Sequence, residues 1–235
     1  MSPTKDLKPL ERRLSVTFRT PELLRQSLTH RSYLNENPEF PLDHNERLEF
    51  LGDAVLELVV TDHLYHHYKL PEGELTNLRS AVVRGEMLSK IAKELELEEF
   101  LLLSRGERKD TGKARQYILA NAVEAVIGAV YLDQGYNAAK LLIDRYIVSK
   151  LEEVVEKGLH VDAKSRFQEL SQERFRVTPI YKVLKESGLD HDKQFTVGVF
   201  LDDKLLGEGI GSSKQEAQQE AAREGLTHIK TLTSL

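Results

Sequence analysis

The chain has 235 residues, of which 40% are hydrophobic and 30% charged, a balance typical of a globular protein. The absence of cysteine excludes disulfides, thiolate zinc sites and cysteine nucleophiles, and it favours work in a reducing cytoplasm. A net charge of −5 argues against nucleic-acid binding through bulk charge, so such binding would depend on local patches. No run approaches the roughly 20 apolar residues that cross a bilayer, and we expect neither a signal peptide nor a membrane partner.

Residues 1–157 follow helical patterns, and we predict an all-α domain there. Pro21 begins a helix that runs to Leu28, and a loop rich in Asn, Pro and Asp follows over residues 35–45. A buried helix is predicted from Glu46 to about Tyr68, because apolar residues recur at three- and four-residue steps. The segment 71–73 breaks this pattern. Further helices are expected over residues 75–84, 86–95, 117–132 and 137–155.

The pattern changes after residue 157, and residues 158–235 predict an α+β domain of the order α-β-β-β-α. A helix is expected over residues 163–175, and a first strand near residues 181–185. Apolar odd positions predict a second strand over 195–201, and a hairpin turn at 202–204 leads into a third over 205–211. Ser213 is the expected N-cap of the closing helix, with Glu216 completing a capping box.

Three carboxylates share one face of the helix predicted from residue 46. Because each helical residue turns the chain by about 100°, Glu46, Glu49 and Asp53 fall within about 60° of one another. Like charges at this spacing destabilise a helix unless something offsets them. A solvated acidic face is one interpretation, and a cation site is the other. His63, His66 and His67 lie off this face, and we expect them at the surface.

A second polar pair, Asn121 and Glu124, interrupts an otherwise apolar helix at i and i+3. A Glu in such a helix is rarely buried without a partner, so the pair marks either an exposed edge or a functional site. Two apolar helices that each present oxygen ligands are typical of a hard-cation site between helices. With no cysteine and no histidine pair among these ligands, the chemistry favours Mg²⁺ or Mn²⁺ over zinc.

The segment His44-Asn45-Glu46-Arg47-Leu48-Glu49-Phe50-Leu51-Gly52-Asp53-Ala54-Val55-Leu56 resembles the signature of the ribonuclease III family. The segments 29–32, 71–76 and 123–129 also fall where that family has them, so the resemblance covers almost the whole chain. It implies an all-α endonuclease domain over residues 1–157, followed by an α+β double-stranded-RNA-binding domain over residues 158–235.

The resemblance also implies an activity and an assembly. The expected reaction is Mg²⁺-dependent hydrolysis of double-stranded RNA by metal-activated water, with Mn²⁺ as a substitute. The expected products carry 5′-phosphate and 3′-hydroxyl ends with a short 3′ overhang. A homodimer is expected, because two sites related by a two-fold axis can cut both strands. Precursors of ribosomal RNA and other structured transcripts are the expected substrates.

Particular residues match the family's functional positions. Those for metal binding are Glu49, Asp53, Asn121 and Glu124, and Asp53 and Glu124 are the catalytic pair. Glu46 and Glu72 match accessory acidic positions near the cleavage centre. Phe50 matches an aromatic residue that is inserted into the partner subunit; without the resemblance, an ordinary core role is equally open. The expected RNA contacts of the second domain are Ser165, Gln168, Glu169, His191 and Lys214.

One position departs from the family pattern, since Asn121 stands where Asp is usual. Asn still offers a carbonyl oxygen but no charge, so we expect weaker metal binding rather than inactivity. Around Lys214, Ser212, Gln215 and Gln218 stand where lysines are common, which predicts modest RNA affinity and a small salt dependence. Two alternatives stay open: an RNA-binding relative that has lost cleavage, and a helical metal-binding oligomer unrelated to RNA.

Overall fold

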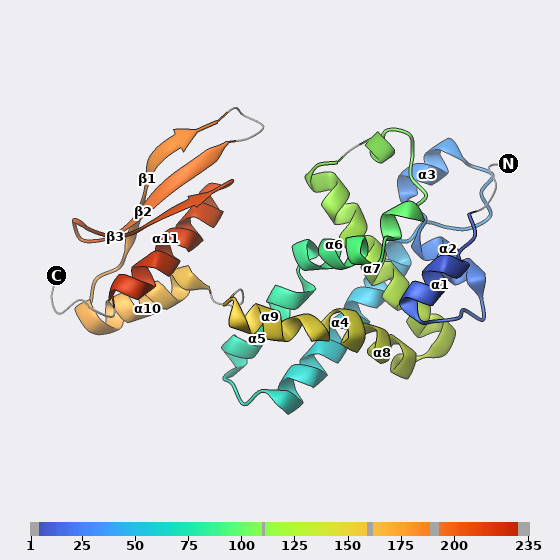
Figure 1. The fold of residues 1–235 in the computed structure, drawn as a ribbon, viewed down its shortest axis with the longest axis horizontal. Helices are drawn as coiled ribbons and strands as arrows, with labels where there is room; N and C mark the ends of the chain where they lie inside the picture. The colour runs from blue at the N-terminus through green and yellow to red at the C-terminus, as the bar shows by residue number, and fades with distance from the viewer. Residues whose placement is uncertain (1–4, 110, 159–161, 189–192, 230–235) are drawn as a thin grey trace. The chain divides into compact units, whose positions relative to one another are not determined.

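A computed structural model describes residues 5–109, 111–158, 162–188 and 193–229. The chain divides into two compact units, residues 1–160 and 161–235, and each is described by itself (Figure 1). The predicted boundary between residues 157 and 158 stays a prediction. Although α4 and α7 each have 22 residues, no helix of the described ranges is long and apolar enough to cross a membrane.

The first unit is all-helical in its described residues, as predicted, apart from one isolated bridge between Thr29 and Leu102. In chain order, the helices of its first half are α1 (Lys8–Leu14), α2 (Pro21–Ser27), α3 (Arg31–Glu36), α4 (Glu46–His67), α5 (Glu72–Val83) and α6 (Gly85–Glu94). The helices that follow are the short 3-10 helices η1 (Leu97–Glu99) and η2 (Glu107–Lys109), then α7 (Lys113–Gln134), α8 (Tyr136–Tyr146), the 3-10 helix η3 (Val148–Lys150) and α9 (Leu151–Glu156).

Several predicted bounds were wrong. Helix α1 was not predicted, and α3 takes the first two residues of the predicted loop at 35–45. Helix α5 begins at Glu72, so the break at 71–73 ends with Pro71. Helix α7 begins four residues before the predicted start at Tyr117. The helix predicted over 137–155 is interrupted by the 3-10 turn η3, where an apolar pattern continues although the α-helical hydrogen bonds do not.

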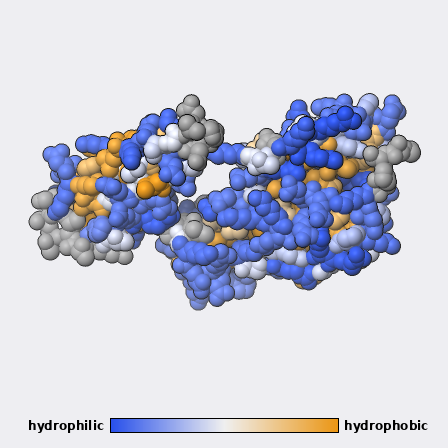
Figure 2. Space-filling view, turned by 45° about the horizontal axis from the view of Figure 1, so that its top comes forward, coloured by the Kyte–Doolittle hydropathy of each residue, from blue (hydrophilic) through white to orange (hydrophobic). Residues whose placement is uncertain are grey.

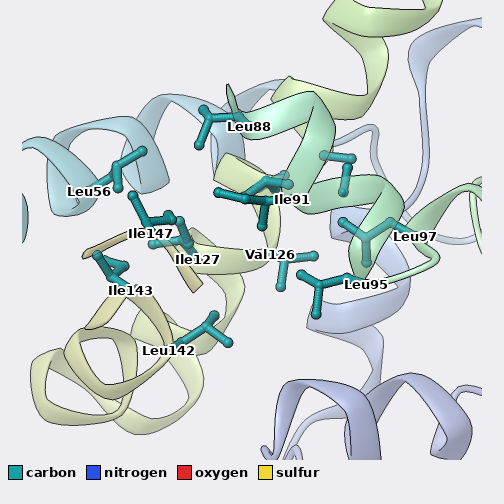
Figure 3. Close-up of a cluster of buried hydrophobic side chains, with 14 of the residues drawn as sticks. Leu56, Leu88, Ile91, Leu95, Leu97, Val126, Ile127, Leu142, Ile143 and Ile147 are labelled. Atoms are coloured by element: carbon teal, nitrogen blue, oxygen red, sulfur yellow. The ribbon is translucent and has the colours of Figure 1, made fainter. Parts of the chain in front are cut away.

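The core of this unit forms where α4, α6, α7 and α8 meet. Figure 3 shows Leu56, Ile91, Ile127 and Ile143, one from each of these helices, within a single buried cluster. All four have relative exposures of 1% or less. Because burying such a side chain contributes about 1.5–3 kcal/mol, this cluster stabilises the packing of α4 against α7.

The second unit follows the predicted α-β-β-β-α order. Its elements are α10 (Ala163–Phe175), β1 (Ile180–Ser187), β2 (Gln194–Leu201), β3 (Lys204–Gly211) and α11 (Lys214–Ile229). The strands form an antiparallel sheet of order β1-β2-β3. The β2–β3 turn places Asp202 at φ 50°, in the left-handed region that Asp tolerates better than most residues.

Helix α11 packs against β2 and β3, and α10 packs against α11 (Figure 1). The core between them contains Phe167 of α10, Val197 and Val199 of β2, and Ala217 and Ala221 of α11, all fully buried. Ser213 is the N-cap as predicted, since the Glu216 backbone N–H donates to Ser213 Oγ at 3.2 Å, but the Glu216 carboxylate accepts from the Ser212 backbone N–H at 2.8 Å, so only half of the predicted capping box forms. Figure 2 shows apolar surface on this unit, and its exposed apolar strand residues are Ile180, Val183, Leu184, Leu205 and Ile210.

Candidate functional site

The start of α4 is anchored by the buried Asn45, which directly precedes the helix. Its backbone N–H donates to the Thr29 carbonyl oxygen at 2.9 Å, and its side-chain amide donates to the Ser27 carbonyl oxygen at 3.2 Å. Both acceptors belong to the end of α2 and the turn after it. These bonds fix the first turn of α4, which carries Glu46 and Glu49.

The two helices that carry the predicted ligands cross at two glycines. A Cβ atom on Gly52 would lie 1.7 Å from the Glu124 carbonyl oxygen, and one on Gly128 would lie 2.2 Å from the Leu48 carbonyl oxygen. Only glycine permits such an approach, so the backbones of α4 and α7 are in direct contact. The side chains of the adjoining turns are thereby brought together across the crossing.

Glu49 and Asp53 of α4 act electrostatically on Glu124 of α7. Burial, followed by the charges of Asp53 and Glu49, raises the pKa of Glu124 to about 7. Burial also raises the pKa of Glu49, with smaller contributions from Glu46 and Asp53, while a hydrogen bond with the Asn121 side chain opposes the rise. The acid cluster, defined here as Glu49, Asp53, Asn121 and Glu124, is therefore brought together from two helices.

Within the described part of the chain, the acid cluster lacks a basic partner. Among the residues that the structure describes, no Lys or Arg forms an ion pair with Glu49, Asp53 or Glu124. Glu46 differs, because its carboxylate lies 3.6 Å from Arg31 Nη1 and 3.8 Å from His44 Nδ1. Glu46 therefore has its own charge compensation, which sets it apart from the other three carboxylates.

The donor set of the acid cluster fits a hard divalent cation, since all its donors are oxygens and its negative charge is uncompensated. Within the described ranges, no three His, Cys, Asp or Glu side chains are grouped closely enough to hold a metal ion as they stand. Asn121 is the fourth oxygen donor of the cluster, and its three carboxylates would have to move closer together to bind one ion.

Glu72 lies apart from the acid cluster. It is the first residue of α5, where its carboxylate accepts a hydrogen bond from Thr76 Oγ1 at 3.2 Å. Further along α5, Arg79 pairs with Glu57 of α4 at 2.8 Å, one turn beyond Asp53. Glu72 is not among the charges that shift the pKa of Glu49 or of Glu124, so within one chain it does not join the cluster.

Phe50 follows Glu49 on α4, and its side chain is 81% exposed. It is the most exposed large apolar side chain in the described part of the molecule. The alternative of an ordinary core phenylalanine is therefore wrong within one chain. This exposure leaves the side chain free for the predicted contact with a partner subunit, which stays a prediction.

Four of the five predicted RNA contacts of the second unit lie on two helices. Ser165, Gln168 and Glu169 are exposed on α10; Ser165 Oγ donates to Asp162 at 2.8 Å, and Glu169 pairs with Arg166 at 3.2 Å. Lys214 begins α11, as predicted. His191 lies outside the described residues.

Lys214 has a partner that the sequence did not reveal. Its Nζ lies 3.1 Å from Glu186 Oε1 at the end of β1, and Lys193 approaches the same carboxylate at 3.4 Å. Both lysines also lie over the Phe195 ring, at 5.8 Å for Lys193 and 5.4 Å for Lys214. Lys193 was missed as a candidate, although its place beside the β1–β2 loop was a usable signal.

Comparisons with known proteins agree with this arrangement. A ribonuclease-III-like family model matches residues 20–151, and the double-stranded RNA binding motif matches residues 163–229. Ribonuclease 3 of Dehalococcoides mccartyi is 44% identical over 226 residues, which cover 96% of this chain and 95% of the relative. Ribonuclease 3 of Carboxydothermus hydrogenoformans is 46% identical over 227 residues, covering 96% and 97%. The solved nuclease domain of ribonuclease III from Campylobacter jejuni is 41% identical with a TM-score of 0.56, covering 61% of this chain and 97% of that domain.

A helical unit with carboxylates at a helix crossing, followed by a double-stranded RNA binding motif, defines a nuclease that acts on duplex RNA. The chain belongs to the ribonuclease III family, whose members depend on divalent metal ions, and it is an endoribonuclease specific for double-stranded RNA. The predicted family and fold class are confirmed. Both alternatives, a non-cleaving relative and a metal-binding oligomer unrelated to RNA, are set aside.

Proposed function

We propose that the chain hydrolyses phosphodiester bonds of double-stranded RNA with water activated by Mg²⁺, for which Mn²⁺ substitutes. The observation that carries this proposal is the uncompensated charge of the acid cluster. Glu49 and Glu124 are half-buried beside Asp53, and burial and the neighbouring carboxylates raise the pKa of Glu124 to about 7. A divalent cation would offset this charge and restore the ionised form of Glu124.

Glu49, Asp53, Asn121 and Glu124 would hold the cation through their side-chain oxygens. When bound, the cation supplies a Lewis acid that lowers the pKa of water and offsets charge on the phosphate. Asp53 and Glu124 are the proposed catalytic residues. Asn121 adds a neutral oxygen, and its hydrogen bond with Glu49 holds that carboxylate in place. Glu46 is assigned an accessory role one turn before Glu49, and Glu72 would reach a cleavage centre only in an assembly.

The products follow from the direction of attack. Water adds to phosphorus, and the bond between phosphorus and the 3′ oxygen breaks. The phosphate stays on the 5′ oxygen of one fragment, and the 3′ oxygen of the other takes a proton. The fragments therefore carry 5′-phosphate and 3′-hydroxyl ends.

A homodimer is part of the proposal, because one acid cluster cuts one strand and a two-fold axis supplies a second. Two staggered cuts would leave a short 3′ overhang. The 81% exposure of Phe50 supports a contact between subunits at this turn of α4. A region of the nuclease domain of ribonuclease III from Campylobacter jejuni is involved in dimer formation, which adds support from a relative.

The second unit would hold the duplex without reading its sequence. A-form RNA presents 2′-hydroxyls and phosphates rather than readable base edges, so polar side chains on an exposed helix suit it. We assign minor-groove contacts to Ser165, Gln168 and Glu169, and a second groove to His191. Lys214 would meet phosphate at the N-terminus of α11. The proposed substrates are precursors of ribosomal RNA and other structured transcripts in the cytoplasm.

The test incubates the full chain with a long perfect RNA duplex in Mg²⁺, in Mn²⁺ and in chelator, and determines fragment lengths and end groups. We expect short fragments with 5′-phosphates in both metals and none in chelator. Glu124→Gln and Asp53→Asn should lose cleavage but keep RNA binding, whereas Glu152→Gln on the exposed face of α9 should keep both. Near-normal turnover by Glu124→Gln, or cleavage in chelator, would overturn the proposal.

A further inference from the structure

His63 and His67 lie one turn apart on α4, and their imidazole rings are stacked. The ring centroids are 4.1 Å apart, and the ring planes differ by 10°. Parallel rings direct their nitrogen lone pairs along separate lines, so the two imidazoles can share one ion only after the His63 ring turns out of the stack toward His67. This geometry is independent of the acid cluster, because His63 lies ten residues beyond Asp53, or about 15 Å along the helix.

The ring nitrogens of the pair are in a state that suits metal binding. His67 Nδ1 lies 2.8 Å from the His63 carbonyl oxygen, and since that oxygen can only accept, Nδ1 carries the proton. The lone pair of His67 is therefore on Nε2, and a bond from Nδ1–H to a carbonyl is the usual way of orienting a metal-binding histidine. His63 makes no ring hydrogen bond within the described residues. Burial and then His67 lower the pKa of His63, which favours the neutral imidazole.

The surroundings of the pair are weakly negative. Asp144 of α8 acts electrostatically on His63; its Oδ2 accepts from Lys140 at 2.8 Å, and its Oδ1 is buried without a hydrogen-bond partner in the described structure. Asp62 precedes His63 and pairs with His66 at 3.4 Å. Neutral imidazoles beside carboxylates attract a cation, and imidazole selects late first-row ions rather than Mg²⁺.

We propose that His63 and His67 form a binding site for a late first-row divalent ion, of the class Zn²⁺, Ni²⁺ or Cu²⁺. The chain supplies two imidazole ligands, and water completes the coordination, since no group of three potential ligands is present in the described ranges. Bridging one turn would stabilise the C-terminal half of α4. The site does not rest on the proposed cleavage function.

The test titrates Ni²⁺ into the full, tag-free chain in excess Mg²⁺. Calorimetry measures the binding, and thermal unfolding measures the change in Tm. We expect one Ni²⁺ per chain and a rise in Tm. His67→Ala removes a ligand and should weaken binding by at least about tenfold. His66→Ala is the matched control, since His66 is exposed on the same helix, but its ring contacts Tyr65 and its Nδ1 bonds to the Asp62 carbonyl oxygen. It should bind Ni²⁺ as the unmodified chain does.

Because His63 is half-buried, its replacement can also change folding, so a spectroscopic measurement separates the two effects. With Cu²⁺ as probe, electron paramagnetic resonance should show nitrogen coupling from two imidazoles in the unmodified chain and from one in His67→Ala. Three results would each overturn the site: no saturable binding, undiminished binding by His67→Ala, or equal losses in His66→Ala and His67→Ala.

Discussion

The point at which a Cβ atom of Gly52 would stand lies 1.7 Å from the carbonyl oxygen of Glu124. Helices α4 and α7 therefore meet backbone to backbone at the turn that carries a proposed catalytic residue. The same crossing sets how far Glu49 and Asp53 stand from Glu124. The spacing of the carboxylates depends on the absence of a side chain at position 52.

Gly52→Ala should therefore damage both stability and cleavage. The new methyl group meets backbone atoms that cannot rotate away, so we expect a loss of about 3 kcal/mol, the upper end of overpacking costs. Because α4 and α7 must separate, the cleavage rate per folded molecule should also fall, beyond the loss that unfolding alone would cause. Denaturant unfolding and single-turnover cleavage measure the two effects. Gly73→Ala on α5 is the control, since a Cβ there meets nothing within 4 Å, and a helical Ala gains up to about 1 kcal/mol.

The raised pKa of Glu124 predicts how stability without metal depends on pH. Folding raises the pKa of this carboxyl from its ordinary 4.5 to about 7, so the folded state holds the proton more tightly than the unfolded state. The resulting penalty is absent below pH 4.5, grows as pH rises to about 7, and is constant above that. Allowing for solvent screening of a partly exposed group, the loss is about 1–2 kcal/mol.

Thermal unfolding in chelator across this pH range, for the unmodified chain and for Glu124→Gln, measures the penalty. The variant should lack the decline and be the more stable of the two above pH 7. Mg²⁺ should reverse the decline in the unmodified chain only, and its apparent affinity should fall below pH 7, where protons compete for Glu124. Parallel stability curves for the two proteins would mean that Glu124 does not titrate in this range.

Asn121→Asp should have opposite effects with and without metal. The substitution adds a negative ligand, so half-maximal cleavage should need less Mg²⁺. It also removes the amide that bonds with Glu49 and adds a fourth carboxylate, so Tm in chelator should fall. Cleavage against Mg²⁺ concentration and unfolding in chelator test the two effects separately. An unchanged Mg²⁺ requirement would show that position 121 does not bind the cation.

Local patterns in the sequence were sufficient to predict most helices and the shared face of Glu49 and Asp53. Periodicity and capping residues are local, and α10 has the bounds they predicted, Ala163–Phe175. Helix α1 was missed because seven residues hold too little of the 3.6-residue pattern. The interruption at η3 was missed because an apolar pattern does not distinguish 3-10 from α-helical turns.

Contacts between distant segments explain the rest. The approach of Asp53 to Glu124 depends on Gly52 and Gly128, which lie 76 positions apart in the sequence and look like ordinary helix-weakening residues within their own helices. The charge compensation of Glu46 depends on Arg31, which begins α3, and on His44, which lies just before α4. Neither relationship produces a periodic pattern in the sequence.

Phe50→Ala should weaken self-association without unfolding the single chain. A phenylalanine that is 81% exposed contributes little to the fold of one chain, but it can contribute at least about 2 kcal/mol at an interface, or about 30-fold in the dissociation constant. Sedimentation velocity over a range of concentrations measures this change. Tyr65→Ala is the control, because Tyr65 is 74% exposed on the same helix and is not assigned to the contact. Equal effects of the two substitutions on self-association would show that Phe50 has no specific role in the interface.

Removing the charge of Glu186 should tighten RNA binding. Lys214 and Lys193 both pair with this carboxylate, and these pairs lower its pKa, so it stays ionised and competes with phosphate for both lysines. In Glu186→Gln the two lysines are free to meet the backbone of the duplex, whereas Lys214→Ala loses one such contact. In chelator, where cleavage is blocked, we expect severalfold tighter binding for the first variant and weaker binding for the second.

Salt dependence distinguishes this mechanism from a change in folding. Each phosphate contact adds about 0.9 to the magnitude of the slope of log affinity against log salt. Lys214→Ala should therefore flatten the slope, and Glu186→Gln should steepen it. Glu208→Gln on β3 removes the same charge from an exposed residue and should leave the slope unchanged. If Glu208→Gln raised the affinity as much as Glu186→Gln, general repulsion of the RNA would explain the gain. A gain confined to Glu186→Gln, together with a steeper slope, means that the pairing with Lys214 and Lys193 is what limits phosphate contact.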